Sequence, residues 1–255
     1  MRLLLLSALI LAALLLSACA SESSVPESSS DSDQVNVDPW EPANRAVFVV
    51  NHGLDSTILK PIAKGYKKVL PNFLRIGVSN FFSNLRTPLS VVNNILQGKG
   101  AAALSDTGRL LLNTTVGIGG LMDPATSAGL EKRNEDFGQT LAVWGVPDGP
   151  FVMVPLLGPR TLRDAFAIPL NLFAHPLYHY DNAPVRDKLW GLGAIQVRAR
   201  LLAADDMINN SYDPYITIRE AYLQNRRYLI YDGDPPDNDQ YLLDDFEEEE
   251  TLSAN

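Results

Sequence analysis

The spacing of hydrophobic residues between positions 38 and 231 predicts a mainly helical fold. Apolar side chains recur there every three or four residues, and the period-two alternation of strands is scarce. The first helical pattern starts at Pro42, a residue type that suits the first turn of a helix, and it places Val47, Val50 and Leu54 on one face. The pattern indicates a bundle of amphipathic helices.

Two further helical patterns follow in the N-terminal half. Residues 70–97 carry apolar side chains at helical spacing on both sides of Pro88. Because proline lacks an N–H group and its ring clashes with the preceding turn, we expect Pro88 to break or kink this helix. Residues 101–117 form the next pattern, which ends in a glycine-rich stretch.

Two longer amphipathic patterns lie near the C-terminus, over residues 183–208 and residues 213–231. In the second, Asp213 has a carboxylate that accepts hydrogen bonds at a helix N-terminus, and Pro214 follows at the first helical position. We therefore expect Asp213 to be the N-cap of the last helix.

The segment between these patterns, residues 149–180, is apolar, is interrupted by prolines and has no clear period. Its apolar runs are too short to span a membrane, so they suit placement at a membrane surface or within one leaflet. A buried core of short helices that begin at prolines explains the same pattern equally well. The sequence leaves both alternatives open.

The N-terminus has the order of a bacterial lipoprotein signal. An apolar run, residues 3–16, is followed by two small residues and then by Cys19, the single cysteine of the chain. We expect removal of residues 1–18 and attachment of lipid to Cys19, because two or three acyl chains anchor a protein firmly. The residue after Cys19 is not the aspartate that retains lipoproteins at the inner membrane, which favours the outer membrane. The alternative is an ordinary secretory signal with a chance cysteine.

The net charge of −9 belongs to the C-terminal end of the chain. Residues 232–255 hold ten acidic residues and no basic one, whereas the preceding 231 residues hold 20 acids and 21 bases. We interpret residues 232–255 as an acidic, disordered tail, with docking to a basic partner as the alternative. Residues 19–37, rich in serine, are interpreted as a flexible tether, and residues 38–231 as the folded domain. No basic stripe points to nucleic acid.

The motifs that resemble catalytic or metal-binding sites lack the neighbouring residues that such sites need. His175 and His179 have the spacing of a zinc-binding helix, but Pro176 lies between them and no glutamate base accompanies them, so loop histidines are favoured. Ser79 lies in a sequence that nearly matches the nucleophile elbow of hydrolases, but Phe81 replaces its last glycine and no strand precedes it. We expect no enzymatic activity, no cofactor and no metal.

Many sequence blocks between Asp38 and Gly233 occur together and in order. They are "DPWEPANRAVFVVNHGLD", "LKPIAKGY", "VSNFFSNL", "VNNILQGK", "GRLLLNTTVGIGGLMDPA", "EDFGQTLAVWGV", "GPFVMVPLLGPRTLRDAF" and "DPYITIREAYLQNRRYLIYDG". In these blocks the chain resembles the MlaA (VacJ) family of outer-membrane lipoproteins.

The resemblance implies a fold and a function. Members form a ring-like bundle of short amphipathic helices, embedded in one leaflet of the outer membrane, with a central channel. Phospholipids misplaced in the outer leaflet enter the channel and leave on the periplasmic side to a soluble periplasmic lipid carrier (MlaC-like), which maintains lipid asymmetry. Members also sit beside a trimeric porin. A lipid hydrolase acting through Ser79 and a porin-associated structural scaffold are the alternatives for this chain.

Three cations are candidates for contact with the phospholipid headgroup. Lys188 and Arg186 lie just before a long amphipathic helix in an otherwise apolar region, and Arg109 lies inside an apolar helix. Lys188 and Arg186 can instead be cations that flank a helix and extend to the membrane surface. For Arg109 the alternative is a structural role in hydrogen bonding.

The glycines Gly117, Gly119 and Gly120 are candidates for a gating hinge, with close packing of a turn as the alternative. The remaining family motifs contribute residues to which we assign a structural role. These are Asp38, Pro39, Glu41, Asn44, Arg45, Asn80, Phe81, Gln97, Gly98, Asp136, Phe137, Gly138 and Trp144.

Overall fold

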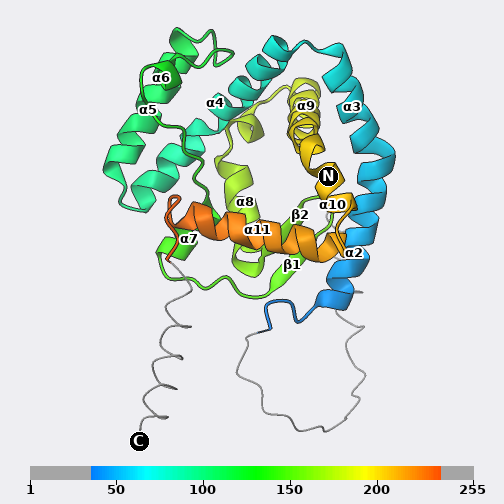
Figure 1. Ribbon diagram of the computed structural model, residues 1–255. Helices are drawn as coiled ribbons and strands as arrows, with labels where there is room; N and C mark the ends of the chain where they lie inside the picture. The colour runs from blue at the N-terminus through cyan, green and yellow to red at the C-terminus, as the bar shows by residue number, and fades with distance from the viewer. Residues whose placement is uncertain (1–35, 237–255) are drawn as a thin grey trace, which may run out of the picture. The chain divides into compact units, whose positions relative to one another are not determined.

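The computed structural model describes residues 36–236, and helices make up most of them (Figure 1). The predicted mainly helical fold is confirmed. Cys19, the residue expected to carry lipid, lies outside the described residues, as do the predicted signal segment, most of the predicted tether and the predicted tail from residue 237 onward. In chain order the elements are α2 (Glu41–Leu54), the π-helix η1 (Asp55–Leu59), α3 (Lys60–Val69), α4 (Asn72–Leu96), α5 (Gly100–Thr115), α6 (Pro124–Ser127), α7 (Phe137–Val143), β1 (Phe151–Val154), β2 (Gly158–Thr161), α8 (Leu162–Ala174), the 3-10 helix η2 (Pro176–His179), α9 (Ala183–Leu201), the 3-10 helix η3 (Leu202–Ala204), α10 (Asp205–Asn209) and α11 (Pro214–Ile230).

Helix α4 runs through Pro88 without interruption, so a break at Pro88 is wrong, whereas a kink there stays a prediction. A proline removes one backbone hydrogen bond, and side-chain bonds to the neighbouring helix α5 compensate on both sides of it. The Asn84 amide donates to the Thr114 hydroxyl at 3.0 Å, and the Asn94 amide donates to the Asp106 carboxylate at 2.9 Å. These long-range contacts hold the two halves of α4 in one helix.

The last helix begins as predicted. The carboxylate of Asp213 accepts hydrogen bonds from the backbone N–H groups of Tyr215 and Ile216, at 2.9 and 3.3 Å, and Pro214 is the first helical residue. The preceding pattern, residues 183–208, is divided in the structure. Helix α9 covers its first part, and η3 and α10 follow it.

The hydrophobic core lies where a short hairpin meets α2 and α11. Strands β1 and β2 pair antiparallel, with Phe151 opposite Thr161. Phe151 and Met153 point inward and are buried together with Tyr215 of α11. The Tyr215 ring packs edge-on against the ring of Phe48 on α2, with 5.7 Å between the two ring centroids. Sequence analysis did not identify this hairpin, because strands of four residues alternate too briefly to give a period.

A buried polar cluster ties the start of the domain to this core. The Asn44 amide donates to the Asp38 carboxylate at 2.8 Å and to the Phe151 carbonyl at 3.0 Å, and the Asn44 side-chain oxygen accepts from the Met153 N–H at 2.8 Å. The Tyr215 hydroxyl donates to the same Asp38 carboxylate. The Asn44 side chain thus bonds backbone groups of β1 that a neighbouring strand would otherwise bond, which supports the structural role assigned to Asp38 and Asn44.

A second set of charges lies beside this cluster. Arg45 forms ion pairs with Glu41 at 2.6 Å and with the N-cap Asp213 at 2.7 Å, and its guanidinium lies 4.5 Å from the centre of the Tyr215 ring. The motif that contains Glu41 and Arg45 therefore connects the first helix to the last one.

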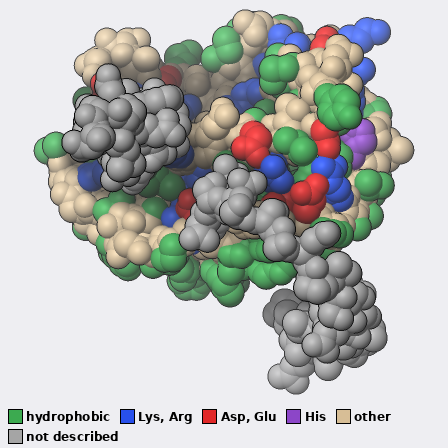
Figure 2. All heavy atoms as spheres, turned by 60° about the horizontal axis from the view of Figure 1, so that its bottom comes forward, with side chains coloured by type: hydrophobic (Ala, Val, Ile, Leu, Met, Phe, Trp, Pro, Cys, Tyr) green, Lys and Arg blue, Asp and Glu red, His purple; other side chains and the backbone are tan. Residues whose placement is uncertain are grey.

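Large apolar side chains remain exposed over much of the domain. Within residues 36–236 no helix is both long enough and apolar enough to cross a membrane. Figure 2 shows charged side chains gathered towards the middle of one face and hydrophobic side chains along its lower edge. The most exposed include Val69, Phe73, Leu104, Leu111, Val116, Ile118, Leu156, Phe166 and Phe173. Exposed apolar surface of this extent marks a binding or membrane-contact surface.

Part of the region of residues 149–180 is buried in the core, as one of the two alternatives predicts, and placement of the rest at a membrane stays a prediction. Phe151, Ala167 and Leu177 are buried, whereas Phe166 and Phe173 are exposed. One side of this region therefore belongs to the core and the other faces outward.

Candidate functional site

A cavity of about 350 Å³ lies where α4, β2, α8, α9 and α11 come together. Charged and apolar side chains share its wall. The lining residues are Arg86, Leu89, Asp136, Leu157, Arg160, Asp164, Ile168, Asn171, Leu172, His175, Trp190, Tyr222 and Arg226. A pocket of this size with mixed lining is typical of a site for a small or amphipathic molecule.

Arg86 extends from α4 into this cavity. Its side chain is accessible to solvent, yet protein surrounds it on most sides, and burial lowers its pKa below the usual value. The charge of Asp136 opposes this effect, whereas the charges of Arg200 and Arg160 add to it. Within residues 36–236 no hydrogen bond or ion pair engages the Arg86 guanidinium. Arg86 is thus a cation at the wall of an open cavity without a counter-charge in contact.

Arg160, on β2, is the second cation of this kind. Its guanidinium donates to the carbonyl of Pro159 at 2.6 Å and lies 5.9 Å from the centre of the Tyr222 ring. No carboxylate in the described part of the chain lies within ion-pair distance of Arg160. The cavity therefore contains two guanidinium groups that have no acidic partner.

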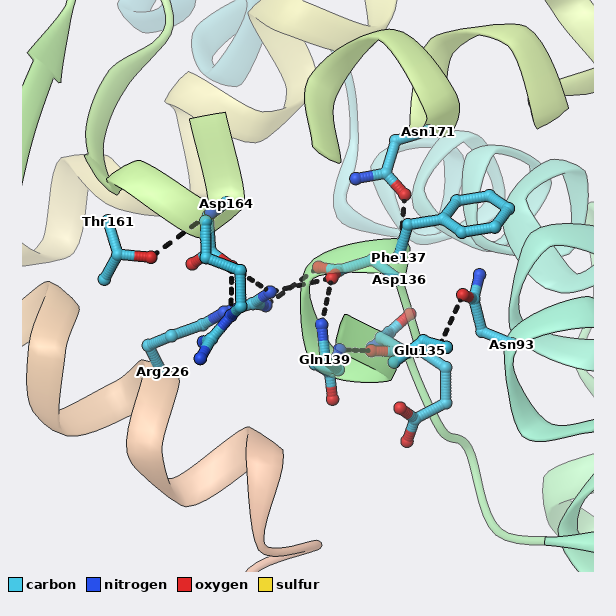
Figure 3. Close-up of polar contacts among 12 residues, drawn as sticks. Asn93, Glu135, Asp136, Phe137, Gln139, Thr161, Asp164, Asn171 and Arg226 are labelled. Carbon is cyan, nitrogen blue, oxygen red and sulfur yellow. Dashed lines mark hydrogen bonds and ion pairs between the residues drawn. The ribbon is translucent and has the colours of Figure 1, made fainter. Parts of the chain in front are cut away.

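The acidic side chains of the cavity are already engaged. Arg226 of α11 donates to both oxygens of Asp136, at 2.8 and 2.7 Å, and to Asp164 at 2.7 Å (Figure 3). The Tyr222 hydroxyl donates to the other oxygen of Asp164. Burial raises the pKa of Asp136, but the hydrogen bonds and charge of Arg226 outweigh it and hold that pKa below its usual value. Both acids are carboxylates fixed by Arg226.

The sequence around Asp136 explains how this network forms. Asp136 is the N-cap of α7 and accepts a hydrogen bond from the Gln139 N–H at 3.0 Å. At Gly138, a Cβ would lie 2.2 Å from an oxygen of Asp164 and 2.3 Å from a nitrogen of Arg226, so only glycine leaves room for the ion pair. The structural role assigned to Asp136 and Gly138 therefore has a specific partner, the Asp164–Arg226 pair.

A second polar network joins the end of α4 to α7. The Gln97 amide donates to the Glu135 carboxylate at 2.9 Å and to the Thr140 hydroxyl at 3.1 Å. That hydroxyl donates to the side-chain oxygen of Asn93 at 2.7 Å. Figure 3 shows Asn93 and Glu135 beside α7, on the side away from Arg226. Two networks thus position α7 between α4 and α11.

Three more motif residues orient these elements. The Phe137 N–H donates to the Asn171 side chain at 3.0 Å, and the Trp144 indole N–H donates to the Leu96 carbonyl at 3.0 Å. Gly98 has a φ of +75°, the left-handed conformation in which glycine commonly ends a helix, and it follows α4. These contacts support structural roles for all three.

The predicted headgroup cations lie elsewhere. Lys188 and Arg186 are on α9, do not line the cavity, and Arg186 pairs with its neighbour in sequence at 3.0 Å. Arg109 is buried in α5 and donates to both oxygens of Asp123, at 2.9 and 2.8 Å, and to Thr126 at 3.1 Å. These bonds support the structural alternative for Arg109. The headgroup role of Lys188 and Arg186 stays a prediction.

The histidine pair has no metal-site geometry. Nδ1 of His175 accepts the Leu177 N–H at 3.2 Å, and Nε2 of His179 lies 2.6 Å from the Phe173 carbonyl. Pro176 begins a 3-10 helix between them. No group of three or more His, Cys, Asp and Glu side chains in the described ranges could hold a metal ion.

His175 is expected to make the stability of the fold pH-dependent. Burial, with the charge of Arg86 adding to it, lowers the pKa of His175 to about 4. The unfolded chain then binds a proton between pH 6.5 and 4 that the folded chain excludes, so stability falls as the pH falls through this range. We expect the free energy of unfolding of His175→Gln to fall less over this pH range than that of the wild type. Urea unfolding at several pH values measures it.

Each pH point is compared between variant and wild type, because other groups titrate in the same range. The pKa of Asp106 is raised to about 6 by burial, and this group contributes stability in the opposite direction as the pH falls. Parallel profiles for His175→Gln and the wild type would contradict the assignment to His175.

The glycine cluster lies in the loop that follows α5. A Cβ at Gly117 would lie 2.4 Å from the Asn113 carbonyl, and one at Gly120 would lie 2.6 Å from the Cβ of Asn84, whereas Gly119 has open space around it. Asn80 of α4 donates to the Leu121 carbonyl of the same loop at 3.3 Å. Close packing therefore applies to two of the three glycines, and the gating role stays a prediction.

Substitution of Gly119 and of Gly120 by asparagine distinguishes the effect of close packing on stability from the effect of backbone conformation. Gly119 and Gly120 both have positive φ, a conformation that asparagine tolerates better than other side chains. We expect Gly120→Asn to lower the free energy of unfolding by about 1–3 kcal/mol through the clash with Asn84, and Gly119→Asn to change it by less than about 1 kcal/mol. Equal effects in thermal or urea unfolding would show that packing on Asn84 does not matter.

Fold and site together define a mainly helical protein with an exposed apolar surface and a cavity that combines apolar side chains with unpaired cations. The family model of the MlaA lipoproteins matches residues 36–229. The chain belongs to this family, and the relationship inferred from the sequence motifs is confirmed.

Individual relatives agree with this assignment. The intermembrane phospholipid transport system lipoprotein MlaA of Escherichia coli is 36% identical over 229 residues, which cover 87% of this chain and 91% of the relative. A protein of Rickettsia prowazekii is 38% identical over 197 residues, which cover 76% of this chain and 78% of the relative. A solved structure, described as the structural basis for maintenance of bacterial outer membrane lipid asymmetry, matches with a TM-score of 0.67 and 38% identity, covering 76% of this chain and 98% of that one.

Proposed function

We propose that this protein takes phospholipids from the outer leaflet of the outer membrane, where they are misplaced, and passes them through an amphipathic channel to a soluble periplasmic carrier. Lipid asymmetry of the outer membrane is maintained by this retrograde transport. The observation that carries the proposal is the cavity, where Arg86 and Arg160 have no acidic partner and lie beside apolar side chains. In such a wall the guanidinium groups can bind the phosphate of a lipid, and the apolar side chains can contact its acyl chains.

The position of the protein in the membrane follows from its surface. Lipid on Cys19 holds the chain at the outer membrane, and the exposed apolar side chains of α4, α5 and α8 enter the hydrocarbon of one leaflet. The described helices form a ring-like bundle around the cavity, an arrangement supported by the residues that α4, α8, α9 and α11 all contribute to the cavity lining. The channel opens on the periplasmic face, beside a trimeric porin.

Transport needs no covalent step. A charged headgroup loses several kcal/mol of hydration free energy when it crosses an apolar layer alone, and a polar passage removes most of that barrier. Acyl chains stay in lipid or against apolar side chains of the wall. The free energy of the misplaced lipid and its capture by the carrier set the direction.

The lipid-hydrolase alternative lacks chemical support around Ser79. This residue lines a different pocket, together with Tyr66, Arg75 and Arg200 among others, and that pocket has no His, Asp or Glu in its lining. A serine nucleophile needs a base within hydrogen-bond reach. The scaffold alternative makes the cavity residues dispensable for lipid clearance.

Cells that lack the protein are expected to accumulate intact phospholipid on their surface. An impermeant amine-reactive label followed by mass spectrometry measures it, with complementation by the wild type and by Ser79→Ala. Both versions should return the surface lipid to the parental level, because neither the serine nor any covalent step is required. An unchanged surface in the deletion strain argues for the scaffold, and release of lysophospholipid or fatty acid by the wild type alone argues for the hydrolase.

A further inference from the structure

The charges in the cavity are not balanced. Arg86, Arg160 and Arg226 line the cavity with two carboxylates, Asp136 and Asp164, so its lining holds one positive charge in excess. Both carboxylates contact Arg226, and no acid of the described residues contacts Arg86 or Arg160. The two are close enough for the charge of Arg160 to lower the pKa of Arg86. The charge of Asp136 attracts Arg86 and offsets part of the repulsion between the two guanidinium groups, which leaves one positive charge for an anionic group to balance.

Apolar side chains complete the same wall. Leu89 is buried beneath the cavity, Ile168 and Leu172 approach from α8, and Leu157 lies between the strands. The neighbouring His175 is neutral at pH 7, because burial lowers its pKa to about 4, and it adds no further charge. The cavity thus offers guanidinium groups for an anion and, within the same space, surface for hydrocarbon.

We propose that Arg86 and Arg160 form a phosphate subsite that favours phospholipids with a net negative headgroup, such as phosphatidylglycerol, over headgroups that carry an ammonium. The inference rests on the proposed transport function and names the substrate class of that site. Two guanidinium groups bind the phosphate oxygens, and the apolar wall accommodates the adjoining part of the acyl chains.

The absence of a free acid in the cavity lining is the source of the preference. The ammonium of phosphatidylethanolamine needs a carboxylate or several acceptors to replace its water, but the carboxylates of Asp136 and Asp164 are occupied by Arg226 and Tyr222. Beside Arg86 and Arg160 that ammonium would meet two more cations. A headgroup of hydroxyls and one phosphate avoids this repulsion and balances the charge that the cavity holds in excess.

Lipid capture from mixed micelles tests the subsite. Full-length, lipidated protein in detergent is incubated with equal amounts of phosphatidylglycerol and phosphatidylethanolamine, and the bound lipid is extracted and quantified by mass spectrometry. We expect phosphatidylglycerol to be enriched about tenfold in the wild type. Arg86→Gln and Arg160→Gln should each reduce the enrichment severalfold, and the double variant should show none.

Two controls make the result specific. Lys68→Gln removes an exposed cation of α3 that does not line the cavity, and it should keep the wild-type enrichment. Titration with inorganic phosphate and with dihexanoyl phosphatidylglycerol, followed by calorimetry, separates a headgroup site from a site for free phosphate. Phosphate that binds as tightly as the lipid, and is lost in the same variants, would overturn the lipid assignment.

The outcomes also separate this inference from the transport function. Wild-type protein that captures both lipids equally, with no change in the two arginine variants, overturns the subsite and leaves transport in place. Wild-type protein that captures no phospholipid overturns the transport function itself. Thermal unfolding of each variant identifies misfolding, and Arg160→Gln, on a different element from Arg86, supplies an independent variant if Arg86→Gln does not fold.

Discussion

Replacement of Arg226 by methionine is expected to lower the free energy of unfolding by about 3–5 kcal/mol, because it leaves the carboxylate of Asp136 without its counter-charge and that of Asp164 with Arg163 alone, at 3.6 Å. Arg226 is only 7% exposed, so water does not replace the lost partner. Urea unfolding followed by circular dichroism at pH 7 measures the effect. Of the single substitutions considered for this fold, this one has the largest expected effect on stability.

Arg227→Met is the matched control. Arg227 follows Arg226 on α11, and its side chain donates an exposed hydrogen bond to the Pro236 carbonyl, so its loss should change stability by less than about 1 kcal/mol. The difference between Arg226→Met and the wild type should also shrink at low pH. The pKa of Asp136 is held below its usual value only while Arg226 is present, so protonation relieves the variant first. Equal stability of the two methionine variants would show that the network does not hold α7 to α11.

Local signals explain which parts of the fold the sequence predicts. The helical patterns around α2, α4, α5 and α11 repeat over three or more turns, and Asp213 with Pro214 marks a helix start by chemistry that acts within four residues. The hairpin of β1 and β2 is too short to show a period. The passage of α4 through Pro88 depends on bonds from Asn84 and Asn94 to another helix, which no local rule contains.

The site was harder to predict because its partners are far apart in the sequence. Asp136 and Arg226 are separated by 90 positions, and no local pattern around Asp136 indicates a partner so far along the chain. A usable signal was nevertheless present. Arg86 is the single charged residue from position 76 to position 98, in an otherwise uncharged amphipathic helical pattern, and a lone charge in such a place is a candidate for a function.

Arg86→Glu is expected to abolish lipid clearance in cells. The substitution places a carboxylate where the phosphate of a passing headgroup would meet a guanidinium, and like charges in an interface cost several kcal/mol. A change of that size lowers occupancy by about a hundredfold or more, so surface phospholipid should rise to the level of the deletion strain. The amine-label assay on complemented cells measures it, with immunoblotting of membrane fractions to compare protein levels.

Lys68→Glu makes the same change of charge on the outer face of α3 and should leave lipid clearance at the wild-type level. Folding can be separated from transport at Arg86 itself. Arg86 has no acid in contact within residues 36–236, and its attraction to Asp136 is opposed by repulsion from Arg160 and Arg200, so Arg86→Gln should melt close to the wild-type temperature. A structural arginine behaves differently, as expected for Arg226. Normal clearance by Arg86→Glu at normal protein level would place the headgroup path elsewhere, and Lys188 on α9 would then be the next cation to test.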